Sequence, residues 1–339
     1  MQAADRSNQS DIMHNSANSE TKCYGLFNGK AGRAILFYLL STNSDKDRYK
    51  EQALKNLDEI AENIASIESL GFAKGLAGIG WMVEWVAQNG FLEMNTDEIL
   101  EEIDDTLYKS VVYSSDKNIS LSKGILGKIL FFSSRYKSKN PNTHRLKSIF
   151  HEECLVLLTD DLQEKISGDE GLLFKENLSN EDLINIGHVI YFFGEFLWTK
   201  VNEQAVEKGL YDCMDFLDRR LGEDVDNINR PNSQNIRINL FLACCFYLAG
   251  RKHQLNIWQD KGLKYINTFR NFYLTTHLKG ALEDNFIILA DLILNEPVSE
   301  IKRLGSFTLT NYHGKQLIQQ LTLQYKINFD TAISLLLLQ

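Results

Sequence analysis

The feature that most constrains the fold of this chain is a motif that occurs three times in its first half. The segments LFNGKAGRAILFYLL (26–40), FAKGLAGIGWMVEWV (72–86) and SLSKGILGKILFFSS (120–134) align without gaps. The first glycines of successive copies are 46 and 49 residues apart, and a polar turn and an amphipathic stretch follow each copy. This period accommodates one helical hairpin, so the pattern predicts a series of stacked α-hairpins. The glycine pairs are Gly29/Gly32, Gly75/Gly78 and Gly124/Gly127.

Glycines three residues apart lie on one face of a helix, where missing side chains let backbones approach closely or let a loop turn sharply into the helix. Each glycine costs up to about 1 kcal/mol in a helix interior, so the repetition requires a structural reason. A nucleotide-binding loop is not favoured, because both common glycine-rich phosphate loops follow a β-strand and have a different spacing. Gly80 adds a third glycine to the second copy.

The rest of the chain also shows helical periodicity. The stretch after residue 45 places Ala53, Leu57, Ile60, Ile64 and Ile67 three or four residues apart, with charged residues between them. Few segments alternate as strands do. The sequence therefore predicts an all-α protein. We also expect a helix in NTDEILEEIDDTLYKSVV (95–112), with its second residue, Thr96, as N-cap.

Composition limits the class of function. The 339 residues are 44% hydrophobic and 24% charged, with a net charge of −9 and no marked basic patch, so we do not expect nucleic acid as a partner. Five cysteines, an odd number, favour free thiols and a cytoplasmic location. No apolar run is long enough for a membrane span. Residues 1–22 are polar and predict a disordered tail, and residues 23–339 predict a single domain.

These motifs, together with INFDTAISLLL (327–337), resemble lanthionine synthetase C-like (LanC-like) proteins. The resemblance implies an α/α toroid of about seven helical hairpins, with parallel inner helices around a central cavity and the glycine motifs at the ends of the inner helices. It also implies a link to peptide modification and lantibiotic biosynthesis. Enzymes of the family hold one zinc ion with two cysteines and one histidine. They add the cysteine thiols of a precursor peptide to dehydrated residues, and the metal lowers the pKa of the attacking thiol.

The zinc ligands implied by the family do not align with suitable residues in this chain. The first cysteine position falls at about Ile236, and Cys244 and Cys245 lie about two turns farther along the same predicted helix, where buried cysteines act as small apolar residues. His277 lies near the second ligand motif, which contains no cysteine here. A zinc site rebuilt from Cys244 or Cys245, His277 and His313 is the weak alternative to a protein without metal.

Two further positions have more than one interpretation. His188 lies near the family's active-site histidine, but a histidine within an apolar helix is also typical of a hydrogen-bonded core residue. Glu84, flanked by Trp81 and Trp85, is expected near the cavity. Glu84 is also a candidate acid for a carbohydrate-active toroid, for which Glu195 is the nearest second carboxylate.

Three functions follow from these observations. The first is a zinc-free LanC-like pseudoenzyme that binds a peptide or partner protein in its cavity, along an aromatic rim of Trp81, Trp85, Phe131, Phe132 and Tyr191. The second is an active cyclase with zinc held by rearranged ligands. The third is an enzyme of another class built on the same toroid.

Overall fold

The computed structural model describes residues 23–27, 29–41, 46–114, 116–140, 145–228, 235–276 and 285–295. Across these ranges the chain is helical and forms no strand, which confirms the predicted all-α class. The segment 1–22, the residues His277 and His313, and the predicted seventh hairpin lie outside the described residues.

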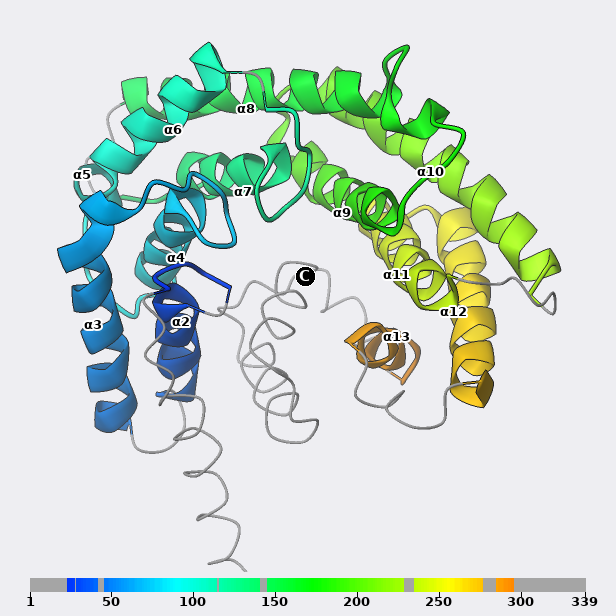
Figure 1. Ribbon diagram of the computed structural model, residues 1–339, viewed down its shortest axis with the longest axis horizontal. Helices are drawn as coiled ribbons and strands as arrows, with labels where there is room; N and C mark the ends of the chain where they lie inside the picture. Colours follow the sequence, from blue (N-terminus) through cyan, green and yellow to red (C-terminus); the bar gives the residue numbers. More distant parts are fainter. Residues whose placement is uncertain are drawn as a thin grey trace, which may run out of the picture.

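The described helices alternate between an inner and an outer layer of an arc (Figure 1). The inner helices are α2 (Lys30–Leu40), α4 (Leu76–Gln88), α7 (Ile125–Tyr136), α9 (Asn180–Phe196), α11 (Ile236–Lys252) and α13 (Asn285–Asn295). The outer helices are α3 (Lys46–Asn63), α6 (Glu101–Tyr113), α8 (Arg145–Ser167), α10 (Glu203–Asp226) and α12 (Asn256–Thr276). Four short helical segments connect them: η1 (Ile64–Ser66), α5 (Thr96–Ile99), η2 (Leu172–Phe174) and η3 (Leu197–Thr199).

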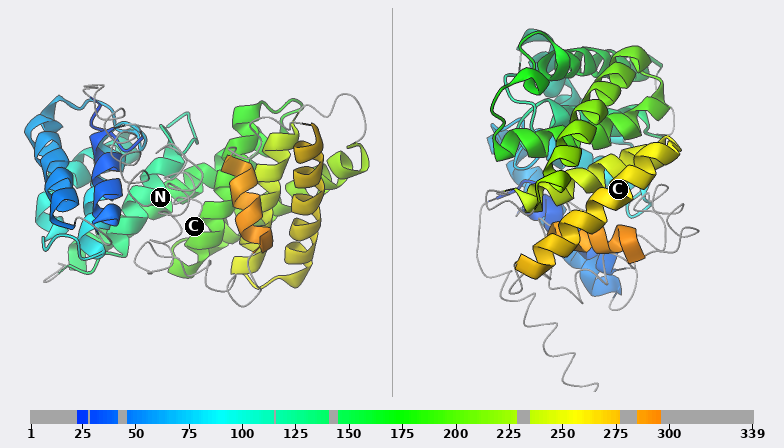
Figure 2. Two further views of the ribbon diagram at one scale, coloured as in Figure 1. Left: turned by 90° about the horizontal axis from the view of Figure 1, so that it is seen from below. Right: turned by 90° about the vertical axis from the view of Figure 1, so that its right-hand side faces the viewer.

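Neighbouring inner helices pack against one another, and each of the inner helices α2, α4, α7, α9 and α11 also packs against the outer helix of its own hairpin. The outer helices α6, α8, α10 and α12 likewise contact one another in sequence, and α13 packs beside α11 and α12 (Figure 2). In the part of the chain that the structure describes, five helical hairpins and the first helix of a sixth therefore follow one another around the arc, as the repeat period predicts.

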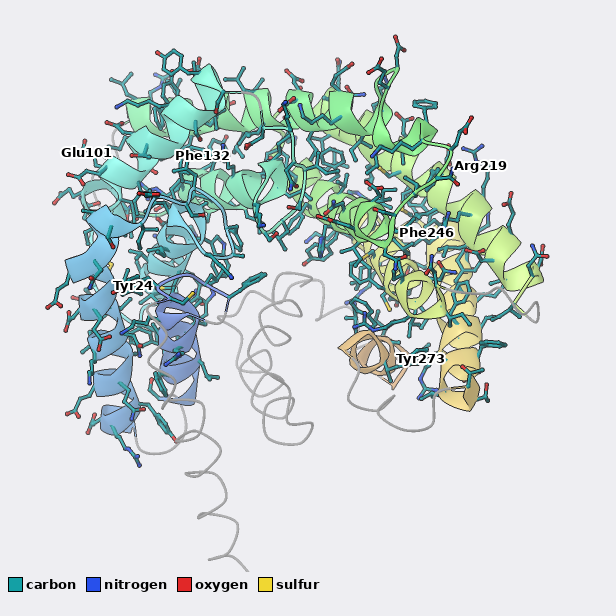
Figure 3. The ribbon with its side chains drawn as sticks, viewed as in Figure 1. Tyr24, Glu101, Phe132, Arg219, Phe246 and Tyr273 are labelled. Carbon is teal, nitrogen blue, oxygen red and sulfur yellow. The ribbon has the colours of Figure 1, made fainter. Side chains whose placement is uncertain are left out.

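The two layers differ in how apolar residues are distributed. Inner helices are covered on several sides, so α4 buries Ile79, Met82 and Val86 as well as Glu84 and Trp85. Outer helices bury a single stripe. In α3 that stripe includes the fully buried Ala53 and the nearly buried Ile60, as the spacing predicts. In Figure 3, Phe132 and Phe246 lie between the layers, and Glu101 and Arg219 lie on the outer side.

The predicted helix at residues 95–112 begins differently from the expectation. Asn95, rather than Thr96, is the N-cap, because its side chain accepts a hydrogen bond from the backbone N–H of Asp97 over 3.2 Å. The helix is also interrupted at Leu100, so that α5 and α6 are separate. Thr96 is thereby placed in the first turn, where its hydroxyl contacts Asn140 and Arg135.

Among the described residues, every helix is too short or too polar to span a lipid bilayer.

Candidate functional site

The glycine motifs form the same turn at the start of each of the first three inner helices. The first residue of each helix donates its backbone N–H to the carbonyl seven residues earlier: Lys30 to Cys23 over 3.0 Å, Leu76 to Ser69 over 2.9 Å, and Ile125 to Asn118 over 3.0 Å. The incoming loop therefore folds back over the first helical turn. This contact satisfies one of the backbone donors that a helix N-terminus leaves without a partner inside the helix.

The glycines are required because this loop lies directly on the helix. A Cβ atom at Gly75 would lie 2.1 Å from the carbonyl oxygen of Ser69, and one at Gly124 would lie 1.9 Å from that of Asn118. At Gly29 the corresponding distance, to the carbonyl oxygen of Gly25, is 2.2 Å. Any larger residue would force the loop away from the helix.

The second glycine of the second and third pairs allows contact between hairpins. A Cβ atom at Gly78 would lie 1.8 Å from the carbonyl oxygen of Phe72 and 3.2 Å from the side chain of Leu26. A Cβ atom at Gly127 would lie 2.5 Å from the side chain of Phe72. Leu26 and Phe72 occupy equivalent positions in successive repeats, so each packs over the second glycine of the next hairpin. Gly32 is buried in the first turn of α2.

Hydrogen bonds connect the same loops from one hairpin to the next. The N–H of Phe27 donates to the carbonyl of Ala73 over 2.8 Å, and the N–H of Ala73 donates to the carbonyl of Ser122 over 2.9 Å. These three residues each lie two positions before the first glycine of their repeat. We call residues 23–27, 66–75, 117–124 and 168–179, which precede α2, α4, α7 and α9, the loop rim.

Two pockets open between neighbouring loops of the rim. A pocket of about 520 Å³ lies between the first and second loops and includes Tyr24, Ile67 and Lys74. A pocket of about 510 Å³ lies between the third and fourth loops and includes Ile119, Lys175 and Asn185. Both volumes fall within the range of small-molecule sites. Polar and apolar groups line both pockets, a combination that suits a peptide.

The glycine turn does not recur at the start of α9 or α11, the next two inner helices whose starts the structure describes. The N-cap of α9 is Ser179, which forms a capping box with Asp182: the Ser179 hydroxyl accepts the N–H of Asp182 over 3.1 Å, and the Asp182 carboxylate accepts the N–H of Ser179 over 3.0 Å. The N-cap of α11 is Asn235. A side-chain cap in α9 replaces the loop contact, so a glycine is not required there.

Glu84 lies in a buried ion cluster rather than on an open surface. Its carboxylate is 1% exposed and accepts a hydrogen bond of 2.6 Å from Nη1 of Arg135. The same guanidinium donates to Asp97 over 3.0 Å and to Asp104 over 2.8 Å. The cluster thus joins α4, α5, α6 and α7, and the Glu84 carboxylate is not accessible to a substrate in this structure. The side chain of Glu195 lies outside the described part of the molecule.

His151 of α8 completes this cluster, with Nε2 lying 3.4 Å from Oδ2 of Asp104. Burial by itself would raise the pKa of Asp104, but the His151 ring and the Arg135 guanidinium hold that pKa below its ordinary value. Sequence reasoning missed Arg135, Asp104 and His151. For the first two the signal was a charged residue at a position that helical spacing assigns to the buried face, such as Asp104 between Leu100 and Leu107.

The expected aromatic rim lies mostly within the helix packing. Trp85, Phe131, Phe132 and Tyr191 are buried in the core. Trp81 is half-buried and packs edge-on against Phe72, with ring centroids 5.6 Å apart. Trp81 is therefore the member of this group that combines partial exposure with contact to the loop rim.

His188 lies nine residues after the N-cap of α9, between Phe192 and Phe241. Its ring keeps some exposure, but Nδ1 is buried and has no hydrogen-bond partner. Burial lowers the pKa of His188 to about 4. The imidazole is therefore neutral at physiological pH. A catalytic base needs a reactive partner within reach, and the surroundings seen here are aromatic rings.

Cys244 and Cys245 are fully buried in the middle of α11. Burial raises the pKa of both thiols, which disfavours the thiolate form that binds zinc. No group of three or more metal-binding side chains occurs among the described residues. His277 and His313, the other suggested ligands, lie outside the described residues. The part of the chain that the structure describes therefore does not fit the two-thiolate zinc site that the resemblance implies.

A comparison with known protein families gives a match. The sequence model described as "Lanthionine synthetase C-like protein" matches residues 7–181, just over half of the chain. The matched span covers the three glycine repeats and extends to the first residues of α9. No curated protein and no solved structure matches this chain.

Proposed function

Because the chain belongs to the lanthionine synthetase C-like family, we propose that it is a zinc-free member that binds a peptide or partner protein at the loop rim. The observation that carries the zinc-free part is the burial of Cys244 and Cys245, whose thiols are surrounded by apolar core and held in the protonated form. A thiolate–zinc centre needs ligands that lose their protons and open toward a substrate.

The position of the two rim pockets supports a peptide as the ligand. An extended chain rises by about 3.3 Å per residue, so a short peptide can contact more than one loop of the rim. The pocket between the first two loops offers the polar residue Ser69, the apolar side chain of Ile67 and the cation of Lys74. Mixed contacts of this kind, fixed by a rigid scaffold, are typical of peptide-binding surfaces.

Binding can be tested with synthetic dehydrated, cysteine-containing peptides, labelled for fluorescence anisotropy. Substitution Ser66→Trp fills the first rim pocket and is expected to weaken binding about tenfold. Glu207→Trp places the same side chain on the exposed face of α10, away from the rim, and should leave affinity unchanged. Equal affinities for the two variants would contradict binding at the rim.

The alternative, an active zinc-dependent cyclase, has a separate test. The purified protein is analysed for zinc and is then incubated with a dehydrated, cysteine-containing peptide. The proposal expects no stoichiometric zinc and no loss of free thiol at constant mass. Stoichiometric zinc that disappears in His277→Ala, together with ring formation, would establish the cyclase instead.

Free thiols also fit the expected reducing compartment, the cytoplasm. All five cysteines are without disulfide partners in the structure, and four of them are buried: Cys154, Cys213, Cys244 and Cys245.

A further inference from the structure

Exposed apolar side chains are concentrated on the outer side of the second and third hairpins. Tyr113 is 81% exposed and Leu146 is 66% exposed, although apolar side chains of this size are normally covered. In contrast, α3, η2, α10 and α12 each carry a single large exposed apolar side chain among the described residues. The group on the second and third hairpins comprises Ile99, Val112, Tyr113, Leu146, Ile149 and Leu157.

The helix α8 presents much of this group as a continuous stripe. Its buried face is formed by Cys154, Leu155, Leu158 and Leu162, which is sufficient to attach it to the inner layer. A second set of exposed residues repeats at intervals of three or four and contains three apolar and three acidic side chains. This stripe consists of Leu146, Ile149, Glu153, Leu157, Asp160 and Glu164. Since this spacing follows one face of a helix, the stripe is a surface that the fold itself does not use.

The charge on this surface is mainly negative. On α5, α6 and α8, Lys109 and Arg145 are the exposed basic residues, whereas exposed acidic residues are numerous. Such a surface repels a second copy of itself, nucleic acid and anionic lipid, and it attracts a cationic partner. The exposed acidic residues are Glu98, Glu101, Glu102, Asp105, Glu152, Glu153, Asp160 and Glu164.

A pocket of about 310 Å³ lies beside this stripe, between the C-terminal end of α6 and the middle of α8. Val112 and Leu157 form apolar walls, and Asp116 and Asp161 contribute carboxylates. Nζ of Lys128 lies 2.8 Å from Oδ2 of Asp116, and Lys165 forms an ion pair with Asp161, so each carboxylate of the pocket already has one cation of this chain beside it. Lysine and arginine side chains have an apolar stem and a charged head, which match these walls and carboxylates.

From this geometry we propose that the outer face of α6 and α8 is a docking surface for a basic, amphipathic segment of a partner polypeptide. Apolar residues of that segment cover Leu146, Ile149 and Leu157, and one of its lysines or arginines enters the pocket beside Asp116. The surface lies on the outside of the arc (Figure 1) and shares no residue with the loop rim. The inference is therefore independent of peptide binding at the rim.

The test uses the full chain and a fluorescent synthetic peptide of about five helical turns with leucine on one face and lysine on the other. We expect saturable binding that weakens as salt is added. The triple variant Leu146→Ser, Ile149→Ser, Leu157→Ser is expected to weaken binding about tenfold. The matched control, Leu54→Ser, Phe174→Ser, Ile257→Ser, removes exposed apolar side chains elsewhere and should bind as the original chain does. Equal affinity of the two triple variants would overturn the proposal.

A charge-reversed pair provides a second arm. Glu153→Lys with Glu164→Lys lies within the stripe, whereas Glu207→Lys with Asp215→Lys makes the same change on exposed positions of α10. The first pair should weaken binding more than the second. Equal binding of a peptide with glutamate in place of lysine would contradict the proposal. Self-association of the original chain in sedimentation would also contradict the proposal if the Leu146→Ser, Ile149→Ser, Leu157→Ser variant abolished it. The occupant of the surface would then be a second copy of this chain.

Discussion

Arg135 joins four elements through a single guanidinium, which donates to Glu84, Asp97, Asp104 and the hydroxyl of Thr96. Its side chain has no exposed surface. A planar group with five N–H donors suits this position, whereas lysine, which has three donors and no fork, does not. The carboxylates around it are spread over α4, α5 and α6, so their burial is tolerated only while Arg135 is present.

We predict that Arg135→Met destabilises the protein by about 3–5 kcal/mol, because it leaves buried carboxylates without their cation. Urea unfolding followed by circular dichroism measures this loss. Arg219→Met, at an exposed position of α10, serves as the control and should change stability by less than about 0.5 kcal/mol. Similar losses for the two variants would show that the cluster does not hold the hairpins together.

Two buried groups predict how stability responds to acid. The pKa of His188 is about 4 in the folded chain against an ordinary value of 6.5, so the unfolded chain binds its proton first. The contribution of neutral His188 to the free energy of unfolding is fully present above pH 6.5 and is lost as pH falls toward 4. The pKa of Asp104 is also lowered, so its contribution is present above its ordinary value of 3.8 and is lost at lower pH.

The prediction is a loss of about 1–3 kcal/mol in unfolding free energy between pH 7 and pH 5. His188→Leu should reduce this loss, while Asp104→Asn should change the profile mainly below pH 4. Urea titrations at fixed pH values provide the measurement. An NMR titration in which His188 gains its proton near pH 6.5 would contradict the assignment.

At the scale of elements, the start of each inner helix decides how closely neighbouring hairpins approach. In the first three hairpins the loop itself covers the helix N-terminus, and in α9 a serine side chain performs this role. The repeat could be predicted from sequence because glycine is required wherever a carbonyl lies against the helix backbone. The pairing of Phe27, Ala73 and Ser122 could not, because a backbone hydrogen bond leaves no side-chain signature.

The glycine turns give a matched pair of substitutions. Gly78→Ala is expected to destabilise the protein by more than about 2 kcal/mol, because its Cβ would lie 1.8 Å from the carbonyl oxygen of Phe72. At Gly222 of α10 a Cβ would lie 3.7 Å from the hydroxyl of Tyr265, an ordinary contact. Gly222→Ala should therefore be neutral or stabilise the helix by up to about 1 kcal/mol. Thermal or urea unfolding of both variants measures the difference, and a harmless Gly78→Ala would show that the loop moves easily.

At the scale of the whole molecule, inner helices are enclosed by neighbours while outer helices have one face in solvent. A cysteine thiol is therefore protected from solvent when it lies on an inner helix or on the buried face of an outer helix. Cys154 and Cys213 lie on the buried faces of α8 and α10, Cys244 lies within α11, and Cys23 is partly exposed at the loop rim. Reactivity of these thiols therefore reports which part of the arc opens to solvent.

We predict that a thiol reagent modifies Cys23 rapidly in the folded protein and leaves the other four cysteines unmodified until unfolding. Mass spectrometry of peptides after brief labelling identifies the sites. Cys23→Ser should abolish the rapid phase. Rapid labelling of Cys244 or Cys245 would place them near an accessible cavity and would favour the zinc-dependent alternative.

What the sequence by itself determined is the local pattern: helices from apolar periodicity, turns from paired glycines, and one hairpin per repeat. These depend on interactions within about ten residues along the chain, which composition and spacing record. Only the tertiary structure decided that Glu84 is held by Arg135 and that α8 presents a second, exposed stripe of apolar and acidic residues. Those outcomes depend on which side of each helix its neighbours cover, and that is settled when the layers pack.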